Sequence, residues 1–361
     1  MSVQELACLR LASQAISRPQ SEQPLEILRR LVAIQGQDYG HAKWAIGLRS
    51  AVNEQQIEAL IEQTQIVRTW LMRGTLHMLA LSDLRWMLGL FAERLLQQRG
   101  RRHRELELDQ ATFTRSRSII EQALSGGKRL DRRSLLALLE AEGIVTSGQR
   151  GIHILQQVSL QGVICQLNAA KNNPLFALID EICPPEDPLP SEEAMQRLAL
   201  SYFRSRGPAT LQDFITWSGM PITAARRALE SVASQLQSRT IDEQTYWFDR
   251  ELDPVGSKPD ALYLLPGFDE YLLGYGQRDA VLDPSHANYI VPGGNGVFFP
   301  IIVYRGRVVG TWKRSLKKDQ LNLTPQVFEA SDQIEQAALQ SAADHYARYL
   351  GLTSPAQILQ E

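Results

Sequence analysis

The chain has 361 residues and a formal net charge of -2, and 44% of its residues are hydrophobic and 22% charged. This composition excludes a disordered chain and gives no global attraction to nucleic acid, so such binding needs local basic surfaces. No stretch approaches the ~18 apolar residues of a membrane helix, and the three cysteines are scattered, as in reduced cytosolic proteins. We therefore expect a cytoplasmic protein without a membrane segment, a disulfide framework or a metal site.

The first segment, residues 1–108, is expected to contain three helices followed by a β-hairpin. The hairpin is predicted at residues 66–80, with Arg73 and Gly74 near its turn. The second helix is predicted to extend through "QGQD", with a frayed last turn loosened by Gly36. The apolar periodicity places the three helices at residues 3–16, 24–38 and 53–65.

Two further segments, residues 109–188 and 189–254, repeat this order of three helices and two strands. Asp131 and Thr210 are predicted helix N-caps because their side-chain oxygens can accept backbone N–H groups, and Gly143 is a predicted helix end. Three helices and a hairpin are typical of a winged helix. We interpret the three segments as a degenerate repeat of winged helices, with three unrelated helical segments as the alternative.

Two proline-rich stretches predict linkers, because proline continues neither a helix nor a central strand. They are "CPPEDPLP", Cys183 to Pro190, and "DPVGSKPD", Asp253 to Asp260. After the second, residues 255–361 are rich in Val, Ile, Phe and Tyr and predict a β-rich domain. An amphipathic helix at residues 331–351 closes the chain, so the overall fold class is α+β.

Four basic clusters stand out in a chain of near-neutral charge. Winged helices mostly bind DNA through a recognition helix and a wing, but they also serve as protein-interaction modules. A solvated helix face is the alternative for each cluster. The clusters are Arg94, Arg99 and residues 101–104; Arg132 and Arg133; Arg226 and Arg227; and Lys313, Arg314, Lys317 and Lys318.

Common enzyme signatures are absent from the sequence: it has no P-loop, Rossmann glycine pattern, HExxH or GxSxG. The glycines of "GGNG" predict a tight turn, and His77 reads by itself as a satisfied, half-buried histidine. The stretch "QGQD" is unusual, because two glutamines, Gln35 and Gln37, follow directly where an apolar run ends. A glutamine amide can orient a water but is a poor base, so it suits a reaction with a good leaving group. Hydrogen bonding to the free carbonyls of a helix end is the alternative.

Five stretches in the same order resemble the winged-helix DNA glycosylases of the AlkZ and YcaQ kind, over nearly the whole chain. Gln35 and Gln37 match the Gln–x–Gln branch of the family's active-site signature, although Gly36 replaces its bulky apolar middle residue. The five stretches are "LVAIQGQDYGHAKWAIGLR", "VRTWLMRGTLHML", "ATLQDFITWSGM", "LPGFDEYLLGYGQR" and "GVFFPIIVYRGRVVGTWKR".

The resemblance implies three tandem winged helices and a β-barrel-like domain around a concave DNA-binding surface. It implies a monomer that removes N-alkylated purines from double-stranded DNA, interstrand crosslinks included, without a metal or cofactor. In this chemistry the alkylated purine is cationic and its glycosidic bond weak, so a positioned water suffices. Gln37 would position that water, Gln35 would orient the water or the sugar, and Asp38 would assist. Because no lysine nucleophile is evident, we expect no lyase step.

The same resemblance indicates residues that contact DNA and residues that hold the domains together. Arg73, Thr75 and His77 would contact DNA from a hairpin of the first winged helix, with Arg314 near phosphate. The basic run, rather than the resemblance, adds Arg101 and Arg102 as candidate phosphate contacts. A structural role is expected for Asp269, Tyr271, Arg278, Trp312 and Arg314. Two rival functions stay open: a DNA-binding regulator without catalysis, and a silent relative that only recognises damaged DNA.

Overall fold

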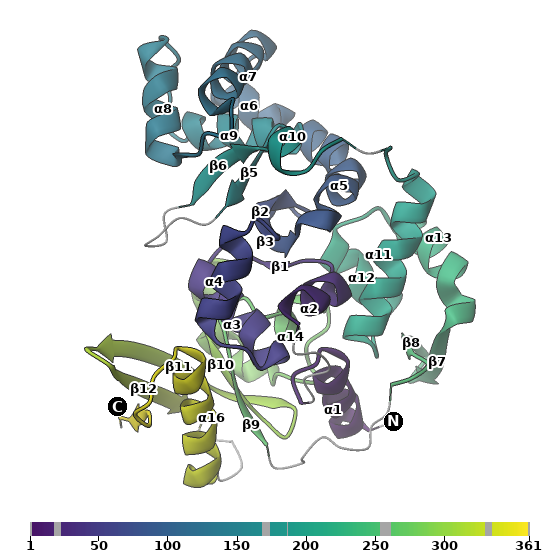
Figure 1. Cartoon of the computed structure of the whole chain (residues 1–361). Coiled ribbons are helices and arrows are strands. Elements are labelled where there is room, and N and C mark those ends of the chain that lie inside the picture. Colours follow the sequence, from purple (N-terminus) through teal and green to yellow (C-terminus); the bar gives the residue numbers. More distant parts are fainter. Residues whose placement is uncertain are drawn as a thin grey trace. The chain divides into compact units, whose positions relative to one another are not determined.

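The computed structural model describes residues 2–17, 23–167, 174–185, 187–252, 261–328 and 334–359 (Figure 1). The predicted linker Asp253–Asp260 lies outside these residues. The chain divides into two units, and the first is assembled from two distant segments, Met1–Ile57 and Gln196–Glu361. The second unit is the stretch between them, Glu58–Met195.

Helices of the first unit come from both of its segments. Two helices, α4 (Glu54–Glu62) and α11 (Ser191–Arg206), run across the boundaries between the units. The others are α1 (Val3–Ser13), α2 (Pro24–Leu31), α3 (Tyr39–Ser50), α12 (Leu211–Ser218), α13 (Ile222–Val232), α14 (Glu270–Leu273), α15 (Ala287–Ile290) and α16 (Gln336–Tyr349).

The main sheet of the first unit is open, with strand order β13-β12-β11-β10-β9. Neighbours are antiparallel except β12 and β13. The described strands do not close into a barrel, so the predicted barrel-like form is wrong. The strands of the unit are β1 (Ile34–Gln35), β7 (Leu236–Ile241), β8 (Gln244–Asp249), β9 (Leu262–Leu265), β10 (Ile301–Tyr304), β11 (Arg307–Lys317), β12 (Gln320–Val327) and β13 (Gln357–Ile358).

An aromatic cluster joins α3 to this sheet and to α16. The Trp44 ring lies 4.8 Å from both Tyr346 and Tyr349, and its indole N–H donates to Leu264 O on β9. Trp312 packs edge-on against Tyr346 and donates to Leu265 O. These buried rings combine a large apolar area with satisfied N–H groups, so they fix α3 on the sheet.

The second unit contains one sheet and the helices that cover it. Strand order is β3-β2-β5-β6-β4, and the predicted hairpin is β2 (Ile66–Leu71) paired with β3 (Thr75–Ala80). The other elements are α5 (Leu84–Gln98), α6 (Gly100–Glu105), α7 (Gln110–Leu124), β4 (Leu130–Asp131), α8 (Arg132–Ala141), α9 (Arg150–Leu160), β5 (Ile164–Leu167), β6 (Leu175–Leu178) and α10 (Ile179–Ile182).

Helix ends follow the cap residues that the sequence offers. Asp131 caps α8 by accepting from Ser134 N, and Thr210 forms a capping box with Asp213 at the start of α12. Both predicted N-caps are confirmed. Within the described residues, no helix is both long and apolar enough to cross a membrane, and no group of three or more His, Cys, Asp or Glu could hold a metal ion.

Two helices of more than ten residues were not expected from the sequence. The stretch "YGHAKWAIGLRS" forms α3 even though glycine disfavours helices. Packing explains Gly47: a Cβ there would lie 2.4 Å from the Tyr349 ring, so only glycine lets α3 approach α16. The other is α5, and α6, which contains the basic residues 101–104, follows it.

Candidate active site

The two glutamines lie on the connection between α2 and α3. Gln35 ends β1 and is buried, whereas Gln37 is exposed two residues later. Gln35 Nε2 donates a hydrogen bond to Gln37 Oε1 at 2.9 Å. The predicted frayed helix is therefore wrong, because α2 ends at Leu31. The strand β1 ends at Gln35, and the bend that follows brings the Gln37 amide within hydrogen-bonding reach of the Gln35 amide.

This pair can hold one water between protein and solvent. Each amide oxygen has two lone pairs, so Gln37 Oε1 keeps one acceptor site after receiving Gln35. The buried Gln35 fixes the direction of the exposed Gln37 side chain. A water donating to Gln37 Oε1 would then present its own lone pair outward, toward a bound molecule.

A strained turn precedes the pair. Val32 adopts φ 66°, ψ −54° and is buried. A positive φ is unfavourable for a β-branched residue and persists only when the surrounding structure enforces it. The Arg206 guanidinium, at the end of α11, donates to Leu31 O at 3.1 Å and to Ala33 O at 3.2 Å. Arg206 therefore holds both carbonyls that flank Val32.

Arg206 is itself fixed by Glu270 of α14. Two guanidinium nitrogens donate to Glu270 Oε2, at 3.0 and 2.8 Å, and the Trp217 indole N–H donates to the same oxygen at 2.9 Å. Arg206 and Glu270 are 0% and 2% exposed, so the pair is buried. The sequence analysis missed Arg206 and Glu270, although both stand inside or beside stretches that it quoted.

Asp38 follows the pair and begins α3. Its carboxylate accepts from His41 N at 2.8 Å, so it is the helix N-cap, and its side chain is 49% exposed. His41 Nδ1 lies 3.8 Å from the same carboxylate. Burial lowers the pKa of His41 and Arg314 lowers it further, while Asp38 opposes both. A neutral His41 thus leaves the Asp38 charge available at the edge of the site.

Arg314 reaches this edge from β11. Its Nη2 lies 3.6 Å from the position that a Cβ on Gly40 would take, and its guanidinium lies over the Tyr346 ring at 5.3 Å. The structure therefore brings Gln35, Gln37, Asp38 and Arg314 together on the first unit.

Comparison with known proteins identifies the family of the chain. The family model of the AlkZ-like DNA glycosylases matches residues 28–349. The chain belongs to the AlkZ-like DNA glycosylase family. One relative, named interstrand DNA cross-link repair glycosylase, from Streptomyces sahachiroi, is 25% identical over 348 residues, covering 91% of each chain.

The fold of this AlkZ-like chain also matches a solved structure. The DNA glycosylase AlkZ of Streptomyces sahachiroi matches with a TM-score of 0.82 at 23% sequence identity, over 100% of both chains. The mixed α+β class predicted from the sequence is confirmed by this match.

The remaining candidates of this AlkZ-like chain belong to the second unit. Arg73 is exposed and Thr75 half-buried at the turn between β2 and β3. His77 is fully buried, with Nδ1 2.9 Å from Thr75 O, so in this conformation it supports the hairpin. Of the three hairpin candidates, solvent therefore reaches Arg73 and Thr75 but not His77.

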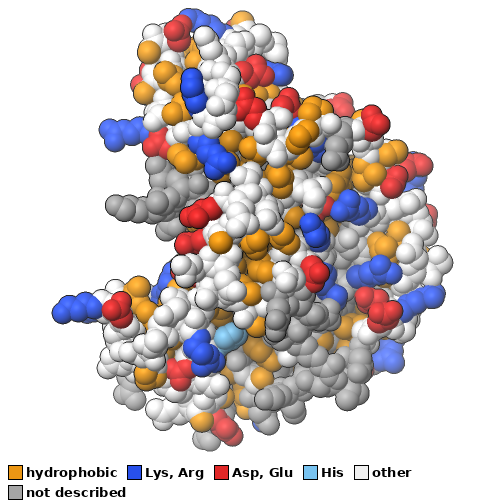
Figure 2. All heavy atoms as spheres, viewed as in Figure 1, with side chains coloured by type: hydrophobic (Ala, Val, Ile, Leu, Met, Phe, Trp, Pro, Cys, Tyr) orange, Lys and Arg blue, Asp and Glu red, His pale blue; other side chains and the backbone are white. Residues whose placement is uncertain are grey.

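The basic run at Arg99–Arg104 is less uniform than its sequence. Arg101 and Arg102 both pair with Glu105, each at 3.0 Å, and these hydrogen bonds lower the pKa of Glu105. Arg99 is half-buried and donates to Gln156 Oε1. In the view of Figure 2, Lys and Arg side chains are scattered among acidic and uncharged ones rather than gathered in one patch.

His103, inside the same run, provides a pH test of the second unit. It is 7% exposed, packs against the Phe113 and His153 rings, and burial lowers its pKa to about 4, with His153 and Arg99 adding to the effect. The unfolded chain therefore binds a proton that the folded chain excludes between about pH 6.5 and about pH 4, and stability falls as pH falls through this window. We expect His103→Gln to flatten the decrease in urea-unfolding free energy between about pH 7 and about pH 5. An unchanged slope would contradict this.

Proposed function

We propose that the protein is a monofunctional DNA glycosylase that hydrolyses the N-glycosidic bond of N-alkylated purines in double-stranded DNA. The observation that carries the proposal is the hydrogen-bonded amide pair of Gln35 and Gln37 beside a strained turn, in a chain of the AlkZ-like family. Local strain of this kind gathers at functional sites because the surrounding structure must hold it.

The chemistry follows from the leaving group. Alkylation at N7 or N3 makes the purine cationic, so the base leaves with the bonding electron pair and becomes neutral. The sugar approaches an oxocarbenium ion, and the water held by Gln37 Oε1 adds to its anomeric carbon. That water then loses a proton to solvent or to Asp38. Because the leaving group needs no protonation, an amide that orients the water is sufficient.

The proposal excludes a lyase step at this site. Lys43, the lysine nearest in sequence to the pair, is buried and lies 2.6 Å from Glu54 Oε1. The ion pair with Glu54 and the burial of its side chain keep the Lys43 ammonium from reaching the sugar of a bound nucleotide. The product would therefore be an intact abasic site, and the name of the Streptomyces relative supports testing interstrand crosslinks as substrates.

We propose the following arrangement around the reaction. Residues 1–108, 109–188 and 189–254 act as three winged helices, and 255–361 as an open β domain, in a monomer. DNA contacts come from Arg73 and Thr75 at the hairpin, with His77 beneath them, and from Arg101, Arg102 and Arg314. The exposed Lys317 and Lys318 at the turn between β11 and β12 extend the charge of Arg314.

The test is base release by the full-length chain in excess over a duplex that carries one N7-methylguanine. Parallel reactions contain an undamaged duplex and a duplex with an interstrand crosslink between N7-alkylated purines. We expect release from the damaged substrates only, leaving an abasic site without strand cleavage. Release from neither damaged substrate would overturn the proposal and favour a DNA-binding relative without a catalytic step.

The contribution of Arg101 and Arg102 is tested by salt. If both contact phosphate, the Arg101→Gln, Arg102→Gln variant should reduce the slope of log affinity against log salt by roughly 1.8. Binding of an undamaged duplex measured at several salt concentrations provides the slope. Arg117→Gln is the control, because Arg117 is also exposed and paired at 2.9 Å, with Glu121. Equal slopes in all three proteins would place the run on a solvated face.

A further inference from the structure

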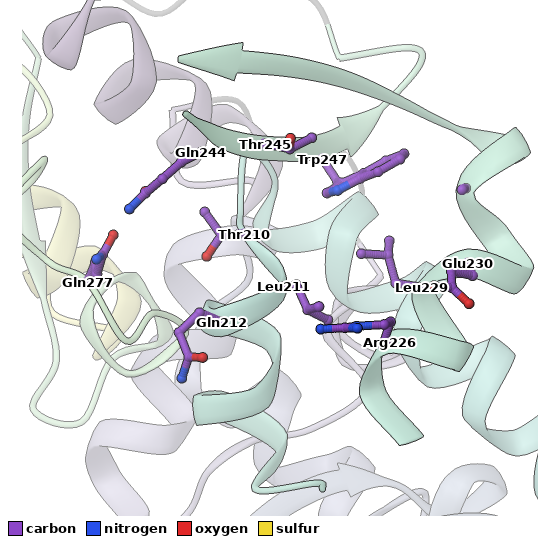
Figure 3. A pocket seen from close by; sticks show the side chains of 11 residues that line it. Thr210, Leu211, Gln212, Arg226, Leu229, Glu230, Gln244, Thr245, Trp247 and Gln277 are labelled. Atoms are coloured by element: carbon purple, nitrogen blue, oxygen red, sulfur yellow. The ribbon is translucent and has the colours of Figure 1, made fainter. Parts of the chain in front are cut away.

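The first unit contains a pocket that the proposed chemistry does not use. It has a volume of about 600 Å³ and lies between α12, α13 and β8. That volume is typical of small-molecule sites in proteins. Figure 3 shows Trp247 on one side, Leu211, Leu229 and Arg226 on the other, and Gln244 and Gln277 at one end.

The backbone of Trp247 is anchored, whereas its indole N–H is available to a ligand. Its backbone exchanges two hydrogen bonds with Ala209, so the strand cannot slide. The side chain is half-buried, and among the described residues none accepts a hydrogen bond from its indole N–H. A flat ring held in this way, opposite leucine side chains, fits another flat ring between them.

The polar groups of the pocket are also available. Within the described part of the chain, Arg226 makes no ion pair, and the Gln277 carboxamide makes no hydrogen bond. Gln244 Oε1 accepts from the Tyr246 hydroxyl, which leaves its NH₂ group to donate. The pocket therefore offers an aromatic face, amides that can donate and accept, and one unpaired cation.

This set of groups matches the chemistry of a nucleotide. A base stacks on an aromatic ring whatever its identity, carboxamides pair with base edges, and a guanidinium binds phosphate. Glu230 stands at the end beyond Leu229, and its carboxylate would repel a phosphate from that end. We propose that this pocket binds one unpaired nucleotide, with its base against Trp247 and its phosphate on Arg226.

The bound nucleotide is either free or part of a DNA strand. Binding of a DNA strand rests on the proposed function. An unpaired nucleotide would become available where a duplex is opened around a lesion. Neither source needs the amide pair of Gln35 and Gln37, so occupancy of the pocket is separable from catalysis.

The experiment measures quenching of tryptophan fluorescence in the full-length chain by thymidine 5′-monophosphate and by a short oligothymidylate. We expect Trp247→Leu to abolish part of the quenching by at least one ligand and to weaken its binding roughly 5- to 150-fold, the effect of losing one base stack. Quenching by the mononucleotide indicates a free nucleotide, and quenching by the oligonucleotide alone indicates a DNA strand. The same binding and quenching in the variant, with both ligands, would overturn the proposal.

A second variant keeps the test valid if Trp247→Leu fails to fold. Arg226→Gln changes an exposed residue of α13 and should weaken binding of the same ligand and reduce its salt dependence. Arg227→Gln, on the next residue of that helix and outside the pocket lining, is the matched control. Equal weakening by both arginine variants would contradict a site at Arg226. No ligand here contains a damaged base, so failure of this test leaves the glycosylase proposal untouched.

Discussion

Replacing Gln37 with alanine is expected to lower the single-turnover rate of base release by roughly 100- to 1,000-fold, the loss typical of one positioned hydrogen-bonding group. The variant removes the amide that receives Gln35 and that would hold the water. Because Gln37 is exposed, the fold and the affinity for damaged duplex should stay within a few-fold of wild type. Release of N7-methylguanine, with binding measured separately on the same duplex, separates the two effects.

The chain contains its own control for this experiment. Gln65 Nε2 donates to Gln63 Oε1 at 2.9 Å, so a second glutamine pair with the same spacing, hydrogen-bonded in the opposite direction along the chain, lies in the second unit. Gln63→Ala should leave base release unchanged. If Gln37→Ala also leaves the rate of base release unchanged, the water is not held by Gln37 and must be held elsewhere in the protein.

The substitution Glu270→Gln is expected to destabilise the first unit by about 3–5 kcal/mol, because it leaves the buried Arg206 charge without a counter-charge. The guanidinium also holds Leu31 O and Ala33 O, so the strained turn at Val32 should loosen with it. Urea unfolding followed by tryptophan fluorescence measures the change. Base release by the protein that remains folded should fall as well, since the turn positions Gln35.

An exposed ion pair and a double variant make this result specific. Glu121→Gln breaks an exposed pair with Arg117 and should change the unfolding free energy by less than about 1 kcal/mol. Adding Arg206→Met to Glu270→Gln removes the unpaired charge and should recover part of the stability. A loss at Glu270 no larger than at Glu121 would show that the buried pair does not stabilise the turn.

Local signals predicted most elements but not the connection that carries the amide pair. The caps at Asp131 and Thr210 and the turn near Arg73 depend on neighbouring residues, so the sequence sufficed for them. The helix predicted through Gln35 failed because its end is enforced by Arg206, more than 170 residues away in the chain. No pattern in the neighbouring residues predicts that the Leu31 carbonyl accepts a hydrogen bond from a residue so far along the chain.

The site residues divide in the same way. The sequence marks Gln35 and Gln37 as polar residues at the end of an apolar run, but it does not mark Arg206, which holds the turn before them. Glu270 lies in one of the stretches that resemble the family, but the sequence does not reveal that its carboxylate is buried and paired with Arg206. Gly47 was misleading for the opposite reason, since a residue that disfavours helices is required there by the Tyr349 ring.

The assembly of the first unit from two distant segments also affects the order of events during synthesis. The turn before Gln35 needs Arg206 and Glu270, so it cannot be held until the ribosome has added about 235 further residues, which takes roughly ten to fifty seconds at usual elongation rates. Until then the N-terminal segment lacks its partners, while the second unit, continuous in sequence, can already fold. The amide pair should therefore be one of the last parts of the protein to form.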